Sequence, residues 1–382
     1  MGRPDSRPEY GERRLTEHLE SFLASHGIPC RRQPVEPGRD NLIARVDGAI
    51  PPERGGVVLF AAHQDTVPVD GMTIEPFAAR VVGGRLFGRG ACDVKGGMAA
   101  MLAALVRLSR RRPAGMPTLI LACTVNEEYG FTGAKALTRL WQDDPGGIIP
   151  RRPDCAIVAE PTSLDVVVAH KGVLRWRVHT HGRAAHGAQP EQGDNAIYRM
   201  GRVLDALQRY HGQVLPERGG HPRCGMATLN VGTIQGGLSV NTVPDRCTIE
   251  VDLRPLPDQP PDEAYQEAVA FLAQEGLAAP QVVHDPPFML GHGLSDARNR
   301  ALADRLAAIA SEVTGACRQV GVPYATDAAF FAAAGVPSVV FGPGALGQAH
   351  TADEWIALDE VDQAAEILDR FGRAVWSGSL GR

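Results

Sequence analysis

Four short apolar runs in the sequence are continuous, without polar alternation, and each is bounded by turn residues. Runs of this kind are typical of strands buried on both faces of a sheet. They span residues 57–62, 118–123, 156–159 and 338–341. Helical patterns with one apolar face lie at residues 97–112, 295–315 and 361–376. Buried strands that alternate with helices predict an α/β architecture with a mostly parallel sheet.

The middle of the chain has a different pattern. Apolar and polar residues alternate at 174–180 and 249–254, which indicates strands with one wet face. Helical patterns lie at 195–211, between these two strands, and at 262–276, after the second. The order strand, helix, strand, strand, helix, strand is that of a ferredoxin-like α+β fold.

These two patterns predict two domains. Residues 1–171 and 288–382 are expected to form the α/β domain, and residues 172–287 a smaller α+β domain inserted into it. A length of 382 residues is compatible with two or three domains of roughly 150 residues each.

Composition excludes several function classes. A net charge of −5 without a basic block argues against nucleic-acid binding. No lysine precedes Ser or Thr, so a P-loop is absent, and no CxxC pair indicates a thiolate zinc site. The longest apolar run falls far short of the ~20 residues that span a bilayer. We expect a cytoplasmic protein without membrane contact.

Histidines and carboxylates follow the predicted buried strands, and one further carboxylate, Asp93, lies just before a predicted helix. In open α/β sheets, ligands bind beyond the carboxyl ends of the strands. Each residue alone has an ordinary interpretation, such as a structural histidine, a solvated acidic pair or a helix N-cap. Together they form an imidazole and carboxylate set that suits zinc, with one ligand more than a tetrahedral site uses. One carboxylate that bridges two metals accounts for the excess. The five candidates are His63, Asp93, Glu128, Glu160 and His350.

The sequence contains an ordered set of motifs: AHQDTVP, GRGACDVKGG, TVNEE, AEPT, HGRAAHGAQP, GGLSVNTVPD, DLR and GPGALGQAHTADEW. In this order they resemble one family, the dinuclear zinc amidohydrolases that include acetylornithine deacetylase, succinyl-diaminopimelate desuccinylase, aminoacylase and glutamate carboxypeptidase. The resemblance covers about residues 57–360, and its one small departure is Ala62, where the family often has glycine. It implies a zinc-peptidase-like catalytic domain and a lid domain that dimerises.

The resemblance also implies how the ligands divide. His63 and Glu160 would hold the first metal, Glu128 and His350 the second, and Asp93 would bridge them. The cofactor would be two Zn²⁺ per chain, for which Co²⁺ can substitute.

Further roles are implied for residues outside the ligand set. Glu127 would be the general base and later the acid, and Asp65 would orient the first histidine ligand. His186 would stabilise the oxyanion in a neighbouring subunit's site, although alone it would be read as a surface-loop histidine. Asn241 and Arg254 would grip the substrate carboxylate, although Arg254 alone would be read as an exposed charge on a sheet face.

The resemblance favours hydrolysis of the amide bond of an N-acyl amino acid by a metal-bridged hydroxide. The best substrate is acetylornithine, which implies arginine biosynthesis, and a homodimer is expected. The alternatives are a dipeptidase or glutamate carboxypeptidase, or a desuccinylase. A non-catalytic binding homologue is a remote alternative, because such a protein would be expected to lack a ligand or the base.

Overall fold

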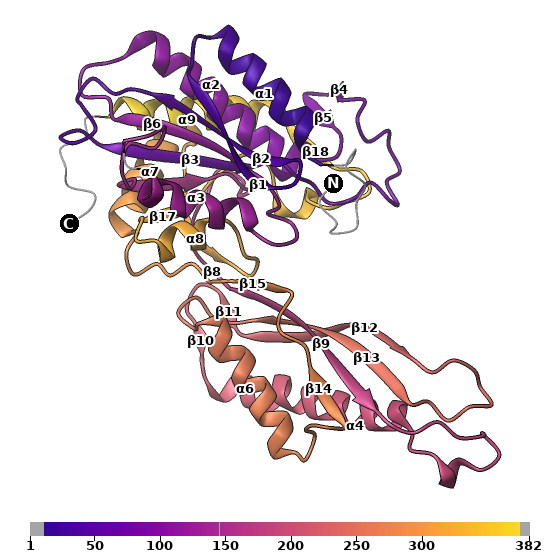
Figure 1. The fold of residues 1–382 in the computed structure, drawn as a ribbon. Helices are drawn as coiled ribbons and strands as arrows, with labels where there is room; N and C mark the ends of the chain where they lie inside the picture. Colours follow the sequence, from indigo (N-terminus) through magenta and orange to yellow (C-terminus); the bar gives the residue numbers. More distant parts are fainter. Residues whose placement is uncertain (1–10, 145, 375–382) are drawn as a thin grey trace. The chain divides into compact units, whose positions relative to one another are not determined.

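A computed structural model describes residues 11–144 and 146–374 of the chain. Their contacts divide the chain into two compact units (Figure 1). The first contains the residues up to Val168, Ser295–Gly321 and the residues from Thr326 onward. The second contains Ala169–Leu294 and Val322–Ala325. None of the helices in the described ranges is both long and apolar enough to cross a membrane.

The first unit is built on an eight-stranded sheet in the order β1-β2-β6-β3-β7-β17-β8-β16. The four central strands β6, β3, β7 and β17 are parallel, whereas β1, β2 and β8 pair antiparallel to their neighbours. The bounds are β1 Cys30–Glu36, β2 Arg39–Val46, β3 Val57–His63, β6 Thr118–Thr124, β7 Cys155–Val158, β8 Val166–His170, β16 Gln319–Val322 and β17 Ser338–Val340. The predicted α/β architecture with a mainly parallel central sheet is confirmed.

Helices pack against this sheet (Figure 1). One apolar core joins the strands to four of them, with residues such as Phe60, Met101 and Phe371 fully buried. These helices are α1 Arg13–Ser25, α2 Gly96–Arg111, α7 Arg300–Thr314 and α9 Leu358–Arg373. Two others, α3 Thr132–Asp143 and α8 Ala328–Ala333, contact each other and the sheet strands. A small sheet in the order β18-β5-β4 is formed by β4 Arg80–Val82, β5 Arg85–Phe87 and β18 Trp355–Ala357.

One helix begins later than its sequence pattern predicts. The expected start was Ser295, but α7 begins at Arg300, after Asn299. The buried Asn299 amide donates to the backbone oxygens of Val168 and Ser338, each at 2.8 Å. Because these bonds tie residue 299 to two strands, the preceding segment forms a turn. The predicted end of the last helix at Trp376 lies outside the described residues.

The second unit has the ferredoxin-like order predicted for it. Its sheet runs β12-β13-β9-β14 with antiparallel pairing throughout. The strands are β9 Val173–His181, β12 Thr228–Gly236, β13 Arg246–Arg254 and β14 Val282–His284. Strand β15, Met289–Gly291, also pairs with β9, and a separate hairpin is formed by β10 Gly220–His221 and β11 Gly225–Met226. The helices are α4 Ala196–Arg209, the short α5 Leu215–Glu217 and α6 Pro261–Gln274. Asn195 is the N-cap of α4, because its side-chain oxygen accepts hydrogen bonds from the backbone N–H groups of Ile197 and Tyr198.

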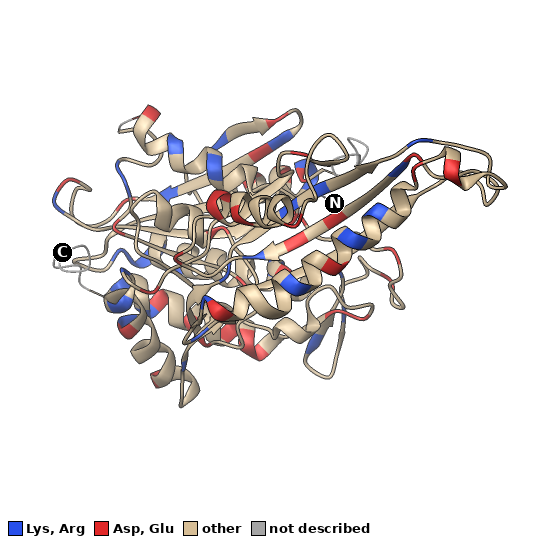
Figure 2. Cartoon of the chain, turned by 90° about the horizontal axis from the view of Figure 1, so that it is seen from below, with Lys and Arg blue, Asp and Glu red and all other residues tan. Residues whose placement is uncertain are grey.

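The polar face of this sheet carries cross-strand ion pairs. Arg177 faces Glu250 across the β9–β13 ladder, with Nε and Oε1 3.0 Å apart, and Arg175 reaches Asp252 at 2.7 Å. Figure 2 shows basic and acidic segments interspersed on the strands and helices in view. This interleaving agrees with the small net charge of the chain.

Candidate metal centre

The parallel strands place several polar residues at one edge of the sheet. His63 is the last residue of β3, and it is in register with Thr124, the last residue of β6. Glu127 and Glu128 follow β6, and Glu160 follows the end of β7. The carboxyl ends of adjacent parallel strands meet at the same edge, which is why these side chains converge.

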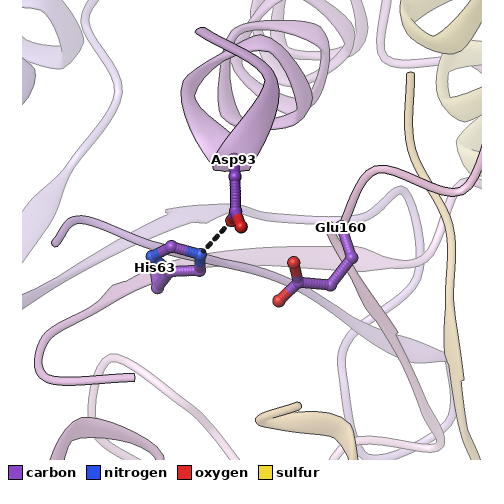
Figure 3. Close-up of side chains that lie close together, drawn as sticks. All are labelled: His63, Asp93 and Glu160. Atoms are coloured by element: carbon purple, nitrogen blue, oxygen red, sulfur yellow. Dashed lines mark hydrogen bonds and ion pairs between the residues drawn. The ribbon is translucent and has the colours of Figure 1, made fainter. Parts of the chain in front are cut away.

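Asp93 lies between two histidines. Its Oδ1 is 3.0 Å from Nε2 of His63, and its Oδ2 is 3.1 Å from Nε2 of His350. Asp93 comes from the turn before α2 and not from a strand end (Figure 3). One carboxylate oxygen therefore faces each histidine, as a bridging ligand requires.

The potential ligand atoms form two groups that share Asp93. The first group is His63, Asp93 and Glu160, and the second is Asp93, Glu128 and His350. Within each group the ligand atoms lie within 4.8 Å of one another. Figure 3 shows the first group, in which Glu160 and His63 point toward Asp93. The structure thus brings all five sequence-predicted ligands together.

The electrostatics of the centre reflect several carboxyl groups that are buried close together. Burial raises the pKa of Glu160 well above its usual range, and Asp93 adds to this effect. Hydrogen bonding to Asp93 and then to Glu128 raises the pKa of His350 to about 10. Burial also disfavours the charged form of Asp93, but His350 and His63 outweigh this and lower its pKa. A cation would remove the repulsion among these carboxylates.

The residues fit divalent metals. Oε1 of Glu128 is buried, and it has only a long, weak contact of 3.4 Å with Nε2 of His350. A buried carboxylate oxygen with so long a contact is poorly satisfied, and ligation to a metal would satisfy it. Two imidazoles and three carboxylates form a nitrogen and oxygen donor set that suits zinc.

Asp65 organises the backbone beside the centre. Its Oδ1 accepts from the backbone N–H of Glu127 and its Oδ2 from that of Glu128, both at 3.1 Å. Its backbone oxygen lies 3.0 Å from Nδ1 of His63 and accepts from Nζ of Lys95 at 2.7 Å. Burial alone would raise the pKa of Asp65, but His63 and the Glu127 amide lower it to about 2. Asp65 is therefore an ionised acceptor that orients a predicted ligand and the predicted base.

Glu127 is buried beside the ligands, yet it belongs to neither ligand group. Burial raises its pKa well above the usual range, and the neighbouring Glu160 adds to the shift. A raised pKa makes the carboxylate a stronger base, which suits a group that takes up a proton and later releases it.

One buried acid near the centre carried no signal in the sequence. Asp327 is 2% exposed and accepts from the Thr124 hydroxyl at 2.6 Å, while its Oδ1 has no partner. Burial raises its pKa to about 6. In the sequence it looks like a helix N-cap before a short apolar stretch, and nothing there indicates that it packs under β6.

The remaining predicted residues lie in the second unit. His186 and Asn241 are neighbours: Thr242 forms a β-bridge with His186, and the Gly187 amide donates to the Asn241 oxygen at 2.7 Å. Arg254 is the last residue of β13. Its Nε donates to Oδ1 of Asp252 at 2.6 Å, and its Nη2 donates to Oδ2 of the same carboxylate at 3.0 Å.

The structure does not bring Asn241 and Arg254 together within one chain. The Asn241 loop precedes the first residue of β13, and Arg254 is the last of the nine residues of this strand. At ~3.4 Å per residue, the strand is roughly 27 Å long.

The fold and the two ligand groups define a class of protein, the metal-dependent hydrolases of amide and peptide bonds. Residues 59–374 match the model of Peptidase family M20/M25/M40, and the chain belongs to this family.

Curated relatives and solved structures agree with this assignment. The chain is 30% identical to an acetylornithine deacetylase of Vibrio cholerae serotype O1, and the aligned region covers 96% of this chain and 92% of the relative. It is 32% identical to an acetylornithine deacetylase of Myxococcus xanthus, over 93% and 90% of the two chains.

The fold is similar to that of a metallo-carboxypeptidase of Sulfolobus solfataricus, with a TM-score of 0.75 and 17% identity. The match covers 94% of this chain and 93% of the carboxypeptidase. It is also similar to a dinuclear metal-binding peptidase of Bacillus subtilis, with a TM-score of 0.63, 18% identity, and coverage of 95% and 92%.

Proposed function

We propose that this protein is a dinuclear zinc deacylase that releases the acyl group of an N-acyl amino acid, with acetylornithine as the favoured substrate. The observation that carries the proposal is the pair of ligand groups that share Asp93, with Glu127 beside them and outside both. The roughly one-third identity to acetylornithine deacetylases over almost the whole chain supports the substrate class.

In this proposal, His63 and Glu160 would hold one zinc ion, Glu128 and His350 would hold the other, and Asp93 would be shared by the two groups. When bound, the two ions would polarise the acyl carbonyl and lower the pKa of water. The chain's own contribution is the fixed geometry of the five ligands, which come from different strands and loops.

Glu127 is the proposed general base. Its carboxyl group would take the proton from the attacking water and later deliver it to the leaving amine nitrogen. Two features suit this role: its pKa is raised by burial and by Glu160, and its backbone is held by Asp65. Proton transfer by a positioned carboxyl group contributes about 10²–10⁴ to a rate.

We further propose that the protein acts as a homodimer formed through the second unit. Strand β12 is at the edge of its sheet, so its outer backbone groups are open to a partner strand. Exposed apolar side chains lie on this strand, on the loop after it and on α4: Ile234, Leu238, Val240, Ile197 and Tyr198. A second copy of the chain would cover both the strand edge and these side chains.

The separation of Asn241 and Arg254 supports the same assembly. An N-acyl amino acid is far shorter than the roughly 27 Å of β13 between them. If both residues bind one substrate, one copy supplies Arg254, and the other supplies Asn241 together with its neighbour His186. In the proposed role, His186 donates a hydrogen bond to the oxyanion, a contribution of about 10²–10³ in turnover.

A substrate panel tests the proposed function. The zinc-loaded enzyme is assayed for amine release from acetylornithine, other N-acetyl and N-formyl amino acids, N-succinyl-diaminopimelate and dipeptides. The highest kcat/KM is expected for acetylornithine. Faster cleavage of dipeptides or of the succinyl substrate would favour the alternative activities, and no turnover of any compound would contradict the enzyme assignment.

The dimer is tested separately by sedimentation velocity of the wild type and of Tyr198→Glu. A dimeric wild type and a weakened dimer in the variant are expected. Gln208→Glu, which adds the same single negative charge near the other end of the helix, is the matched control. A monomeric wild type at micromolar concentration would contradict the proposal.

A further inference from the structure

Glu354 is a fully buried carboxylate that is not one of the predicted metal ligands. Its Oε2 accepts from Nη1 of Arg89 at 2.8 Å and from the Gly90 amide at 2.9 Å. Its Oε1 accepts from the amides of Cys92 and Asp93, at 2.8 and 3.0 Å. Both oxygens are therefore fully used, and four donors from one short turn converge on a single side chain.

This turn carries the shared ligand. Asp93 is itself one of the four donors, through its backbone N–H. Gly90 has φ +82°, and a Cβ there would lie 2.7 Å from Cγ2 of Thr66. The turn thus adopts a conformation and a packing that need glycine, and the Glu354 carboxylate satisfies the amides that this conformation turns inward.

Glu354 also belongs to the segment that carries another ligand. It lies four residues after His350 and directly before β18, whose Trp355 pairs with Phe87 of β5. The backbone oxygen of Glu354 accepts from the Gly88 amide at 3.0 Å. The turn with Asp93 and the segment after His350, which are about 260 residues apart, are therefore joined through one residue.

The two ligand groups differ in how they are supported. His63 ends a central strand and Glu160 follows another, so hydrogen bonding within the sheet fixes them. His350 lies on a loop, and its side chain is 51% exposed. The position of His350 relative to Asp93 therefore depends on contacts between loops, and Glu354 makes the most heavily bonded of these.

We propose that Glu354 is a positioning residue that holds Asp93 and His350 in register and thereby sets the metal affinity of the group Asp93, Glu128 and His350. The proposal rests on the metal assignment of the proposed function. It attributes no ligation and no proton transfer to Glu354. Its effect passes through the backbone of the turn to the side chain of Asp93.

The test compares Glu354→Gln with Asp369→Asn. Glutamine keeps the shape of the side chain but turns an –NH₂ group toward backbone N–H donors, so at least one pair of contacts is lost. Asp369 is the matched control, because it is also fully buried and paired with arginines, Arg111 at 3.3 Å and Arg373, yet it bonds to no predicted ligand.

Zinc and cobalt are titrated into each metal-free protein against a chelator of known affinity, and the cobalt absorption spectrum is recorded. The wild type should bind two ions per chain. In Glu354→Gln, the affinity of the ion held by Asp93, Glu128 and His350, identified as the ion that His350→Ala loses, should fall about 10- to 100-fold, the range known for residues that orient metal ligands. The other affinity should change much less, and the cobalt bands of the affected ion should shift. Asp369→Asn should bind both ions like the wild type.

Several outcomes would overturn the inference. Unchanged affinities in Glu354→Gln, equal losses at both sites, or the same loss in Asp369→Asn would each do so. If Glu354→Gln does not fold, Arg89→Gln removes one of the four donors and leaves the carboxylate in place, and the same titration decides with a smaller expected loss. A wild type that binds no metal would instead contradict the proposed function, so the two failures are distinguishable.

Discussion

Oδ1 of Asp65 accepts a hydrogen bond from the backbone N–H of Glu127 at 3.1 Å. The other oxygen of the same carboxylate holds the next amide, that of Glu128. The backbone oxygen of Asp65 faces Nδ1 of His63. One residue thus orients the predicted ligands His63 and Glu128 and the predicted base Glu127.

The substitution Asp65→Asn should lower kcat about 10- to 100-fold, with a smaller change in KM. The amide keeps one acceptor oxygen but presents –NH₂ to the other backbone donor, so the segment with Glu127 loses a contact. The backbone acceptor for His63 is retained, and zinc content should stay near that of the wild type. Steady-state kinetics with metal analysis is the measurement, and an unchanged kcat would remove Asp65 from this role.

The substitution Glu127→Gln should keep the bound metal and lower kcat by about 10²–10⁴. Glutamine has nearly the same shape and keeps the backbone bond to Asp65, but it cannot accept the proton. Metal analysis and turnover are measured on the same sample. Near-normal turnover with two metals bound would mean that another group is the base.

The substitution Asp93→Ala should cost the protein both metals. Its two oxygens face His63 and His350 separately, so no single remaining group can take the place of the carboxylate. Metal content after gel filtration measures the effect, and Asp369→Asn again serves as the buried-carboxylate control. Two metals per chain in the Asp93 variant would rule out the bridging assignment.

The affinity for zinc should rise with pH. In the metal-free protein, Asp93 and Glu128 raise the pKa of His350 to about 10, so zinc must displace a proton from this ring at neutral pH. Each displaced proton makes the affinity roughly tenfold higher per pH unit. Competition titrations between pH 6.5 and 8.5 measure the slope, and a flat profile would contradict the predicted ionisation.

The same shift has the opposite consequence for the metal-free fold. Because the pKa of His350 is raised above its unfolded value of ~6.5, the stability it contributes is fully present below that pH. This contribution is lost as the pH rises through about 10. The contribution of His350 to the stability of the metal-free protein should therefore fall at alkaline pH, whereas the zinc affinity increases. Urea unfolding of the wild type and of His350→Ala with a chelator at pH 7 and pH 10 measures this contribution, and an equal difference at both pH values would contradict it.

The substitution Arg254→Ala should raise KM for carboxylate substrates on the order of tenfold to a hundredfold, because a hydrogen bond to a charged group is lost. Asp252 holds the guanidinium by Nε and Nη2, so the side chain is already oriented before substrate binds. Arg177→Ala, on the same sheet face, is the matched control. Equal damage toward an ester-capped substrate would disprove the carboxylate contact.

The sequence alone determined the buried strands, which follow from local periodicity, and the edge of the sheet at which polar residues gather, because parallel strands end there together. Continuous apolar runs located β3, β6, β7 and β17 to within about a residue, because burial on both faces leaves no room for polar side chains. The residues after these strands were expected at one edge because parallel strands end there together. The motif order indicated the family before any distance was known.

Tertiary structure decided what depends on contacts between distant segments. Asp93 sits in a turn, and its position between His63 and His350 follows from packing that no local pattern encodes. The buried roles of Asp327 and Glu354 were not predictable, because a carboxylate gives the same sequence signal whether it is solvated or surrounded by donors. The antiparallel strands β1 and β2 carry no continuous apolar run of the predicted kind, because β1 is partly exposed and the buried stretch of β2 is short and flanked by charged residues. Periodicity reports which face of an element is buried, but only the folded chain determines which groups meet there.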